Sequence, residues 1–366
     1  MNTNTSTLNI IGWGKIVPQL SVFFAVLKHR PNGLTPFNLF VSGGPGTNKT
    51  EGVVQLAKYL GYTVGHQDAS TLDDIAELAG MIDLKANREE GQSRIIEGDL
   101  LNKEVLVLDE TLNMRPHVVP QMRLFLQGKL VLMAKQIDVQ NKTIIGMANL
   151  DEDMLVGQAN TFDSPTADRF AMLVRVPSLW EMTAEEQSAI LEGKGHEGFA
   201  AEFQAAVQAI DGKFVEIERD YGSHATSYVR ALGAALQAGS TQRSPFSFEG
   251  RRGKLLRSFV IAAIALCEGQ KERDLKDTVW AVVHDCLTCH RLSGLELKIQ
   301  DLRSAHLTAF EVLKNLGVES LIAAASNLSE KIGLMMKHLN QVSAVTKADI
   351  AGQIAGSADL ALQIAA

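Results

Sequence analysis

The first half of the chain alternates short apolar runs with segments whose apolar residues recur at helical spacing. Continuous apolar runs predict strands buried on both faces, as in a parallel sheet, and spacings of three and four predict helices. Strands are expected at residues 38–41, 62–64, 105–108, 143–148 and 172–176, and a hairpin at 130–133 and 136–139. Helices are expected at residues 16–27, 52–60, 72–84 and 112–126, and a surface loop or hairpin at 85–98. Strands that alternate with helices are typical of an α/β fold.

The second half of the chain has no strand pattern after Thr183. Helices are expected at residues 183–192, 198–211, 222–238, 250–267, 274–292 and 300–316. A last helix over 319–344 carries apolar or small residues at a four-three spacing, at positions 321, 325, 328, 332, 335, 339 and 342. This seam has two interpretations, a coiled coil or an amphipathic helix packed on its own domain. The pattern divides the chain into a core (1–182), a helical connector (183–249), a helical lid (250–317) and a C-terminal extension (318–366).

The composition is that of a large globular protein. The chain has 366 residues, 46% of them hydrophobic and 21% charged, which suffices for two or three domains. Its formal charge of −7 argues against bulk nucleic-acid binding and leaves room for a local basic patch. No apolar run is long enough for a membrane span, and the amino terminus lacks a signal-peptide pattern. Three cysteines do not suggest a disulfide framework, so the expected compartment is the cytoplasm.

A glycine-rich loop joins the first expected strand to the helix behind it. It reads Ser42-Gly43-Gly44-Pro45-Gly46-Thr47-Asn48-Lys49-Thr50. Glycines let several backbone N–H groups turn toward one anion, the helix amino terminus adds its positive end, and Lys49 supplies a point charge. In such loops the hydroxyl after the lysine, here that of Thr50, binds Mg²⁺. The loop therefore predicts a triphosphate site, although Asn48 stands where a glycine usually precedes the lysine.

Acidic and amide side chains follow two other expected strands. Asp109 and Glu110 end the strand that begins at Val105, at the end where parallel sheets bind their ligands. One acid that holds Mg²⁺ and a second that activates water are what an ATP hydrolase needs. The alternative is that both acids only cap the next helix. Asn149 ends a further strand, and it either orients the attacking water or is only a turn residue.

Cys286, Cys289 and His290 form the string C-x-x-C-H, which is also the attachment motif of c-type haem. The string lies inside an expected helix, and no second pair of ligands is spaced for zinc. We therefore expect these residues in the core or in an interface rather than in a haem or metal site.

Taken in order along the chain, these motifs resemble the AAA+ ATPases and, among them, the MoxR-like proteins. The family's P-loop has the form G-x-P-G-x-x-K-[ST], in which the residue before the lysine need not be glycine, and residues 43–50 fit it. Residues 108–116 are similar to the family's D-E-x-N-R-x-P segment with one residue extra, and residues 97–101 to its G-P-h hairpin. Met147-Ala148-Asn149 matches the sensor-1 position, and Ala167-Asp168-Arg169-Phe170 matches the family's L-D-R-F.

The resemblance covers about residues 8–292 and implies an AAA+ P-loop αβα sandwich with a parallel sheet, then an all-α lid and a helical C-terminal extension. It also implies which residues bind ATP: Ile11 and Gly12 at the adenine, and Gly43, Gly44, Pro45, Gly46, Thr47, Asn48, Lys49, Thr50 and Glu51 around the phosphates. Thr50 and Asp109 would hold Mg²⁺, Glu110 would polarise the attacking water, and Asn149 would be sensor 1.

Two arginines complete the set that the resemblance implies. Arg169 would be an arginine finger that reaches the site of a neighbouring subunit, where such a residue contributes about 10³–10⁵ in rate. Its alternative role is a surface salt bridge. Arg252 aligns best with sensor 2, with Arg251 as its close competitor, and the alternative for Arg252 is a solvated charge at a helix start.

The function that the resemblance implies is Mg²⁺-dependent ATP hydrolysis by a homo-oligomeric ring, expected to be a hexamer, that remodels a protein partner in a chaperone-like way. Threading unfoldases usually carry an aromatic–hydrophobic–glycine loop, but residues 65–98 contain no Phe, Tyr or Trp, so local remodelling is favoured. MoxR-type ATPases often work with von Willebrand A domain proteins, although no residue here identifies the partner. Two alternatives stay open: a nucleic-acid-dependent motor, which the charge argues against, and an ATP-binding scaffold with little turnover.

Overall fold

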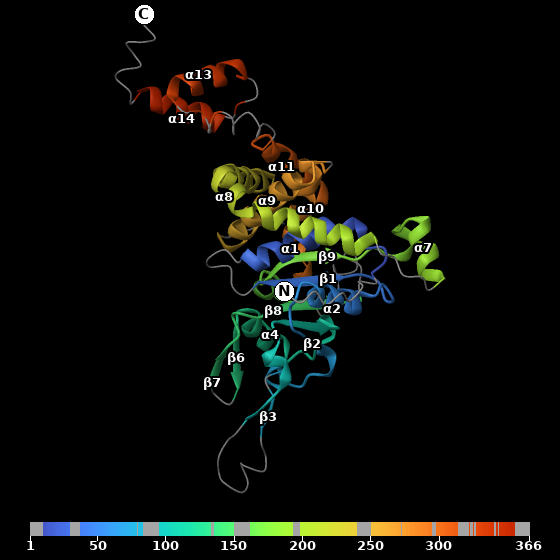
Figure 1. The fold of residues 1–366 in the computed structure, drawn as a ribbon. Helices are drawn as coiled ribbons and strands as arrows, with labels where there is room; N and C mark the ends of the chain where they lie inside the picture. The colour runs from blue at the N-terminus through green and yellow to red at the C-terminus, as the bar shows by residue number, and fades with distance from the viewer. Residues whose placement is uncertain are drawn as a thin grey trace, which may run out of the picture. The chain divides into compact units, whose positions relative to one another are not determined.

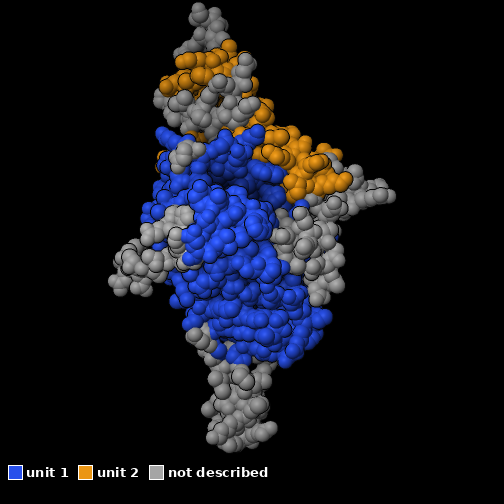
Figure 2. All heavy atoms as spheres, turned by 90° about the vertical axis from the view of Figure 1, so that its right-hand side faces the viewer, with its two compact units in different colours: residues 1–213, 249–297 blue, residues 214–248, 298–366 orange. Residues whose placement is uncertain are grey.

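The structure is a computed structural model, and it describes residues 10–29, 37–78, 80–82, 95–132, 135–149, 162–192, 198–239, 250–271, 273–294, 298–313, 322, 325, 327–339, 342 and 344–355. The chain forms two compact units, coloured separately in Figure 2: residues 1–213 with 249–297, and residues 214–248 with 298–366. These units differ from the four segments expected from the sequence, because most of the expected lid belongs to the same unit as the sheet.

Five parallel strands form the central sheet of the first unit, in the order β2-β5-β8-β1-β9 (Figure 1). They are β1 (Asn38–Ser42), β2 (Val64–Asp68), β5 (Val105–Asp109), β8 (Thr143–Ala148) and β9 (Phe170–Arg175). Every residue of β1 and β8 is buried, as expected for strands covered on both faces. The parallel sheet, the loop between β1 and the helix after it, and the helical second half confirm the expected α/β P-loop fold with a helical extension.

Helices cover both faces of this sheet. Phe40, Leu108 and Ile144 occupy one face, because side chains alternate along a strand, and they pack in one apolar cluster with α4 (Val119–Leu126). The other face is covered by α1 (Val17–His29), α2 (Lys49–Tyr59) and α10 (Leu275–Leu287), and α9 (Gly250–Gly269) packs on α1 and α10. The sheet is therefore the middle layer of a sandwich.

The remaining elements are short or lie in the helical second half. The hairpins are β3 (Gly80–Ile82) with β4 (Ile95–Glu97) and β6 (Lys129–Leu132) with β7 (Lys135–Asp138). The 3₁₀ turns are η1 (Gly14–Ile16), η2 (Ala69–Thr71), η3 (Ile75–Leu78), η4 (Asp99–Asn102), η5 (Thr111–Asn113), η6 (Leu179–Glu181) and η7 (Thr288–Ser293). The other helices are α6 (Ser164–Ala167), α7 (Ala184–Leu191), α8 (Gly198–Gly239), α11 (Ile299–Phe310), α13 (Leu328–Lys337) and α14 (Ala344–Ala355). Within the described part of the chain, no helix combines the length and the apolarity that crossing a bilayer requires.

Residues 72–84 do not form the expected helix, which was wrong. The described part of this stretch contains η3 and β3 instead. Carboxylate oxygens of Asp68 and Asp74 accept hydrogen bonds from the backbone N–H groups of Ser70 and Ala76, at 2.9 and 2.7 Å. Local bonds of this kind compete with a helix because they satisfy N–H groups in another conformation. The apolar spacing still reflects burial of Leu72, Ile75 and Leu78.

Three further boundaries differ from the sequence prediction. β2 begins only at Val64, where the expected second strand ended, because this edge strand is partly exposed and carries polar residues. The helix expected from residue 112 begins at Val119, after η5, and has a proline in its first turn. The two helices expected within 198–238 are one helix, α8, of 42 residues.

The single last helix expected over 319–344 was also wrong. α13 ends at Lys337, and α14 begins at Ala344. Leu328, Ile332 and Met335, which belong to the four-three seam, pack in a small apolar cluster with Ile350 of α14. The structure therefore favours an amphipathic helix packed within its own chain over a coiled coil. Seam position 321 lies outside the described residues.

Candidate active site

The P-loop begins where β1 ends and leads into the first turn of α2. Asn48, which precedes α2, has a φ of 58°, and Gly46 has a φ of 78°. Both values are in the left-handed region, which glycine enters freely and asparagine enters more easily than most residues. Asn48 can therefore take the backbone conformation for which a glycine is usual, and the unusual residue does not prevent the loop from forming.

Lys49 lies inside the loop that it follows. Its ammonium group donates hydrogen bonds to the carbonyl oxygens of Gly43 and Gly44, at 2.9 and 2.7 Å, and the residue is 4% exposed. Thr47 closes the same curve, because its hydroxyl donates to Gly44 O at 2.9 Å. Pro45 and Gly46 are exposed to solvent, so the loop is open on its outer side. The positive charge of Lys49 is therefore surrounded by backbone groups at the amino end of a helix.

Thr50 and Asp109 are brought together by the sheet. The hydroxyl of Thr50 donates to Asp109 Oδ2 at 2.6 Å, and Nε2 of His66 lies 4.0 Å from the same oxygen. Mg²⁺ prefers oxygen ligands and is commonly held by one or two protein oxygens together with phosphates and water. A hydroxyl next to a carboxylate fits that requirement. Among the described residues, no group of three His, Cys, Asp or Glu side chains is arranged to hold a metal by itself.

Glu110 follows Asp109 in a strained backbone conformation. Its φ is 49°, in the left-handed region where a glutamate is uncommon. Its carboxylate accepts a hydrogen bond from Asn113 Nδ2 at 2.5 Å and another from the side-chain amide of Asn149. Since Ala148 pairs with Ser42, Asn149 stands beside the start of the P-loop. Glu110 is thus turned away from a normal strand path and fixed by two amides at the carboxyl edge of the sheet.

The segment before α1 packs against the first turns of α2. A Cβ on Gly52 would lie 2.6 Å from the Trp13 ring, and a Cβ on Gly12 would lie 2.2 Å from the sulfur of Met182. Both glycines therefore allow a close approach. Ile11 and Gly12, expected at the adenine, lie next in the chain to a residue that contacts the P-loop helix. Glu51, in the first turn of α2, is exposed and accepts a hydrogen bond from Gln55 at 2.8 Å.

Arg175 ends β9 beside the start of the P-loop, because it pairs with Ser42. Its guanidinium binds both carboxylate oxygens of Glu181, and Ser178 N donates to Glu181 Oε2 at 2.8 Å. These bonds lower the pKa of Glu181 to about 2, with the Arg175 side chain as the main cause. The ion pair fixes the turn that carries Met182.

Arg169 lies at the amino-terminal end of the parallel strands, and the P-loop of the same chain lies at their carboxyl-terminal end. It immediately precedes Phe170, which pairs with Asn38 at the start of β1. The P-loop begins after the last residue of β1, so a strand length of roughly 16 Å, at about 3.3 Å per residue, separates the two. Nε of Arg169 is buried and has no hydrogen-bond partner among the residues that the structure describes.

Arg252 is likewise not brought to the P-loop. It is 1% exposed, and its guanidinium bonds to Asp168 Oδ1 at 2.9 Å and to the carbonyl oxygen of Ala171 at 3.2 Å, both at the amino end of β9. Arg251 donates to Asp168 O at 3.2 Å. Burial lowers the pKa of Arg251 to about 10, and the nearby positive charge of Arg169 contributes. The expected sensor-2 position of Arg252 at its own nucleotide, and that of its competitor Arg251, are therefore not supported by this geometry.

The C-x-x-C-H residues are buried where α10 continues into η7. Cys286 and Cys289 are free thiols, and burial raises the pKa of both. The carbonyl oxygen of Cys286 accepts a hydrogen bond from Arg252 at 2.9 Å. Burial also lowers the pKa of His290 to about 4. These residues contribute to the core of the first unit, in line with the interpretation from the sequence.

Sequence reasoning did not identify three polar residues that hold this arrangement together. Asn113 binds Glu110, Asp168 binds Arg252, and Asn38 bridges strands inside the sheet. Asn38 carried a usable signal, because an asparagine in an otherwise apolar strand needs buried partners. Asn113 and Asp168 stood in recognised motifs, but the partner of Asp168 lies 84 residues away in the sequence. The partner of Asn113, Glu110, is only three residues away.

No protein-family model matches this sequence, and no curated protein sequence matches it. Among solved structures, one similar chain is that of a putative ATPase from Cytophaga hutchinsonii ATCC 33406. It is 14% identical in sequence, the match covers 76% of this chain and 82% of that chain, and the TM-score is 0.46. A likeness at this level carries no conclusion about activity.

Proposed function

We propose that this protein is an ATPase that hydrolyses ATP at the carboxyl edge of its sheet. The observation that carries the proposal is the convergence of the P-loop, Thr50 with Asp109 at 2.6 Å, and Glu110 with Asn149 on three adjacent strand ends. Lys49 and the loop N–H groups bind the phosphates, and Asn48 supports the loop's conformation. Glu110 accepts a proton from the attacking water, and Asn149 orients that carboxylate.

Thr50 and Asp109 would hold Mg²⁺ through their side-chain oxygens. A bound Mg²⁺ would neutralise negative charge on the transferred phosphoryl group. The chain's own contribution is to keep these two oxygens adjacent before ATP binds. The hydrogen bond between them joins the first turn of α2 to the end of β5, so that both elements hold one site.

We further propose that the active form is a homo-oligomeric AAA+ ring of the MoxR type, in which Arg169 completes the site of a neighbouring subunit. Its position at the opposite sheet edge supports this, because the residue is far from its own P-loop. Contact between one end of the sheet and the opposite end of the sheet in the next subunit is a heterologous interface, which forms a ring when the rotation between subunits closes. A hexamer is the expected size.

Within this proposal, ATP turnover remodels a protein partner, for which a von Willebrand A domain protein is the first candidate. The absence of an aromatic residue in 65–98 supports local remodelling rather than threading. One assay distinguishes this remodeller from the two alternatives, a nucleic-acid-dependent motor and a scaffold with little turnover. Steady-state ATPase activity is measured with and without DNA: strong stimulation by DNA contradicts the remodeller, and no turnover at any protein concentration contradicts the enzyme.

Glu110→Gln tests the assignment of the acid. The variant keeps the size of the side chain but loses the base, so we expect ATP affinity within a few-fold of wild type and hydrolysis reduced by about 10²–10⁴. The measurement pairs binding of a fluorescent ATP analogue with phosphate release. Glu216→Gln, at an exposed acid of α8, is the matched control and leaves both values unchanged. Wild-type turnover in Glu110→Gln contradicts the assignment.

A further inference from the structure

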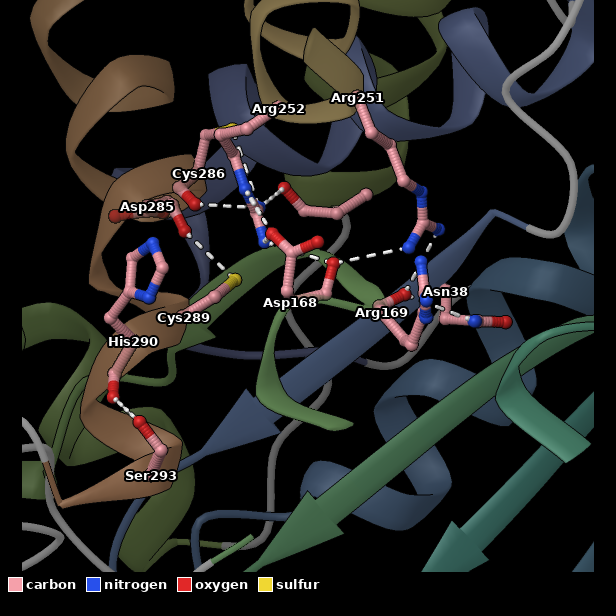
Figure 3. Close-up of polar contacts among 11 residues, drawn as sticks. Asn38, Asp168, Arg169, Arg251, Arg252, Asp285, Cys286, Cys289, His290 and Ser293 are labelled. Carbon is pink, nitrogen blue, oxygen red and sulfur yellow. Dashed lines mark hydrogen bonds and ion pairs between the residues drawn. The ribbon is translucent and has the colours of Figure 1, made fainter. Parts of the chain in front are cut away.

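The start of α9 is bonded to Asp168 and Arg169, the two residues that lead from α6 into β9. Arg252 donates from Nη2 and Nε to Asp168 Oδ1, at 2.9 and 3.3 Å, and from Nη2 to Asp168 O at 3.1 Å. Arg251 donates to the same carbonyl at 3.2 Å and to Arg169 O at 3.5 Å. Figure 3 shows both guanidinium groups directed at this short segment. Two successive carbonyl groups and one carboxylate are therefore held by one helix end.

The sheet holds the same segment from the other side. Asn38 Nδ2 donates to Arg169 O at 3.1 Å and to Leu126 O at 3.1 Å, while its Oδ1 accepts from Ile144 N at 3.1 Å. The backbone of Arg169 is thus bonded both to the sheet and to α9. The backbone that carries the Arg169 side chain is therefore fixed in place, although Arg169 lies in the connection between α6 and β9.

Arg252 is costly to bury for stability alone. Its guanidinium also donates to the carbonyl oxygens of Ala171 and Cys286, at 3.2 and 2.9 Å, so its charge is compensated by several bonds. Replacing a buried ion pair by apolar residues of similar volume is often neutral or stabilising. What a planar guanidinium gives that an apolar residue cannot is a fixed, bidentate geometry at its partners.

We propose that Arg252 is a positioning residue for Arg169. It holds the Asp168–Arg169 segment so that the Arg169 side chain is presented to the nucleotide site of the neighbouring subunit. This inference rests on the proposed function, in which Arg169 acts on a neighbour. It assigns Arg252 to the neighbour's site and not to the nucleotide of its own chain, which is the opposite of a sensor-2 role.

Arg252→Lys and Asp168→Asn test the positioning. A lysine keeps the charge but cannot form the fork of hydrogen bonds, and an asparagine keeps the shape of Asp168 but not its charge. Because a misplacement of about 1 Å can cost about 10²-fold in rate, we expect kcat to fall by about 10- to 100-fold. The Kd for ATP stays within about twofold, since the P-loop is untouched. Arg257→Lys, the same substitution further along α9, is the control and keeps wild-type kcat.

Mixed oligomers decide whose site Arg252 serves. Arg252→Lys and Lys49→Ala chains are co-expressed with different tags and purified through both, so that every oligomer contains both variants. Roughly a quarter of the heterologous interfaces then join an intact P-loop to an intact Arg252. We expect the mixture to hydrolyse ATP roughly 3- to 25-fold faster than Arg252→Lys alone, for a 10- to 100-fold loss in that variant, because these interfaces are wild type. The same experiment with Arg169→Ala and Lys49→Ala is run in parallel.

The outcomes separate the two proposals. Gain of activity in both mixtures supports the positioning role. Gain with Arg169→Ala but none with Arg252→Lys shows that Arg252 serves its own chain's site and overturns the inference. No gain in either mixture overturns the shared site of the proposed function. A raised Kd for ATP with unchanged kcat in Arg252→Lys also overturns the inference, because it is the signature of a residue at its own nucleotide.

Discussion

Two non-glycine residues in the described part of the chain have a positive φ, and both belong to the candidate active site. They are Asn48 and Glu110. Such conformations cost about 1–3 kcal/mol each and persist only where the surroundings impose them. For Asn48 the cost is small, because asparagine tolerates this region. For Glu110 two amide hydrogen bonds offset it. Strain in this site is therefore concentrated on the residue proposed as the base.

The backbone of Asn48 gives a prediction about the loop. Asn48→Gly should bind ATP within about threefold of wild type, because glycine adopts the same φ freely. Asn48→Val should bind about 5- to 30-fold more weakly, because a β-branched residue costs about 1–2 kcal/mol in the left-handed region. Titration with a fluorescent ATP analogue measures both. Equal affinity of the two variants would show that the loop does not need this conformation to bind nucleotide.

His290 predicts how stability depends on pH. Burial, with a smaller effect of Arg252, lowers its pKa in the folded state to about 4 from 6.5, while nearby Asp168 acts in the opposite direction. The unfolded chain thus binds the proton first, so stability is full above about pH 6.5 and falls as the pH drops toward 4. At pH 5.5, one unit below the unfolded-state pKa, the free energy of unfolding is lower by about 1.4 kcal/mol.

Urea unfolding at pH 7.5 and pH 5.5 measures this loss, and His290→Gln is the comparison. The glutamine variant removes the titrating group, so its stability should fall by about 1.4 kcal/mol less than that of wild type between the two pH values. Other groups titrate equally in both proteins and cancel. Equal losses would show that His290 is not protonated on unfolding.

At the scale of elements, the strands were predictable because burial on both faces leaves continuous apolar runs. β1, β5 and β8 follow those runs closely, and the acids and the amide at the ends of β5 and β8 predicted the candidate site. β2 was not predictable in this way because it is a partly exposed edge strand with polar residues. The turns around Leu72 were not predictable either, because the side chains of Asp68 and Asp74 accept hydrogen bonds from nearby backbone N–H groups. The connection of α9 to Asp168 also has no local signal, since the partners are 84 residues apart.

The helical pair at the end of the chain gives a prediction at this scale. Ile350 of α14 is 1% exposed and lies in the cluster with Ile322 and Val342. Ile350→Ala should weaken the pair by about 2 kcal/mol or more, because it leaves a cavity between α13 and α14. Gln353→Ala, at an exposed position of the same helix, should change it by less than about 0.5 kcal/mol.

Hydrogen exchange of the amides in α13 and α14 reads out the Ile350 prediction. Exchange in both helices should accelerate together in Ile350→Ala, while ATP turnover stays at the wild-type rate. Faster exchange in α14 alone would indicate that the two helices do not form one packed unit. The four-three seam would then be better explained by a coiled coil between chains.

At the scale of the whole molecule, the sheet separates the two groups of residues that the proposed function assigns to one shared site. The P-loop, Asp109 and Glu110 stand at the carboxyl edge, and Arg169 stands at the amino edge with Arg251 and Arg252 behind it. In one chain these two groups cannot meet, because the length of β9 lies between them. In the proposed ring, such a shared site ties catalysis to assembly, and turnover per chain depends on how many subunit interfaces are formed.

The proposed shared site predicts that ATP turnover depends on protein concentration. ATP turnover per chain should rise with protein concentration and level off where sedimentation velocity shows that assembly is complete, because dilution removes Arg169 from each neighbour's site. Arg169→Ala should assemble over the same concentration range but stay about 10³-fold or more below wild type at every concentration. The difference between the two turnover curves measures the contribution of Arg169 separately from the effect of assembly. Full turnover by a chain that sediments as a monomer would mean that each subunit contains a complete site, and that Arg169 has no part in it.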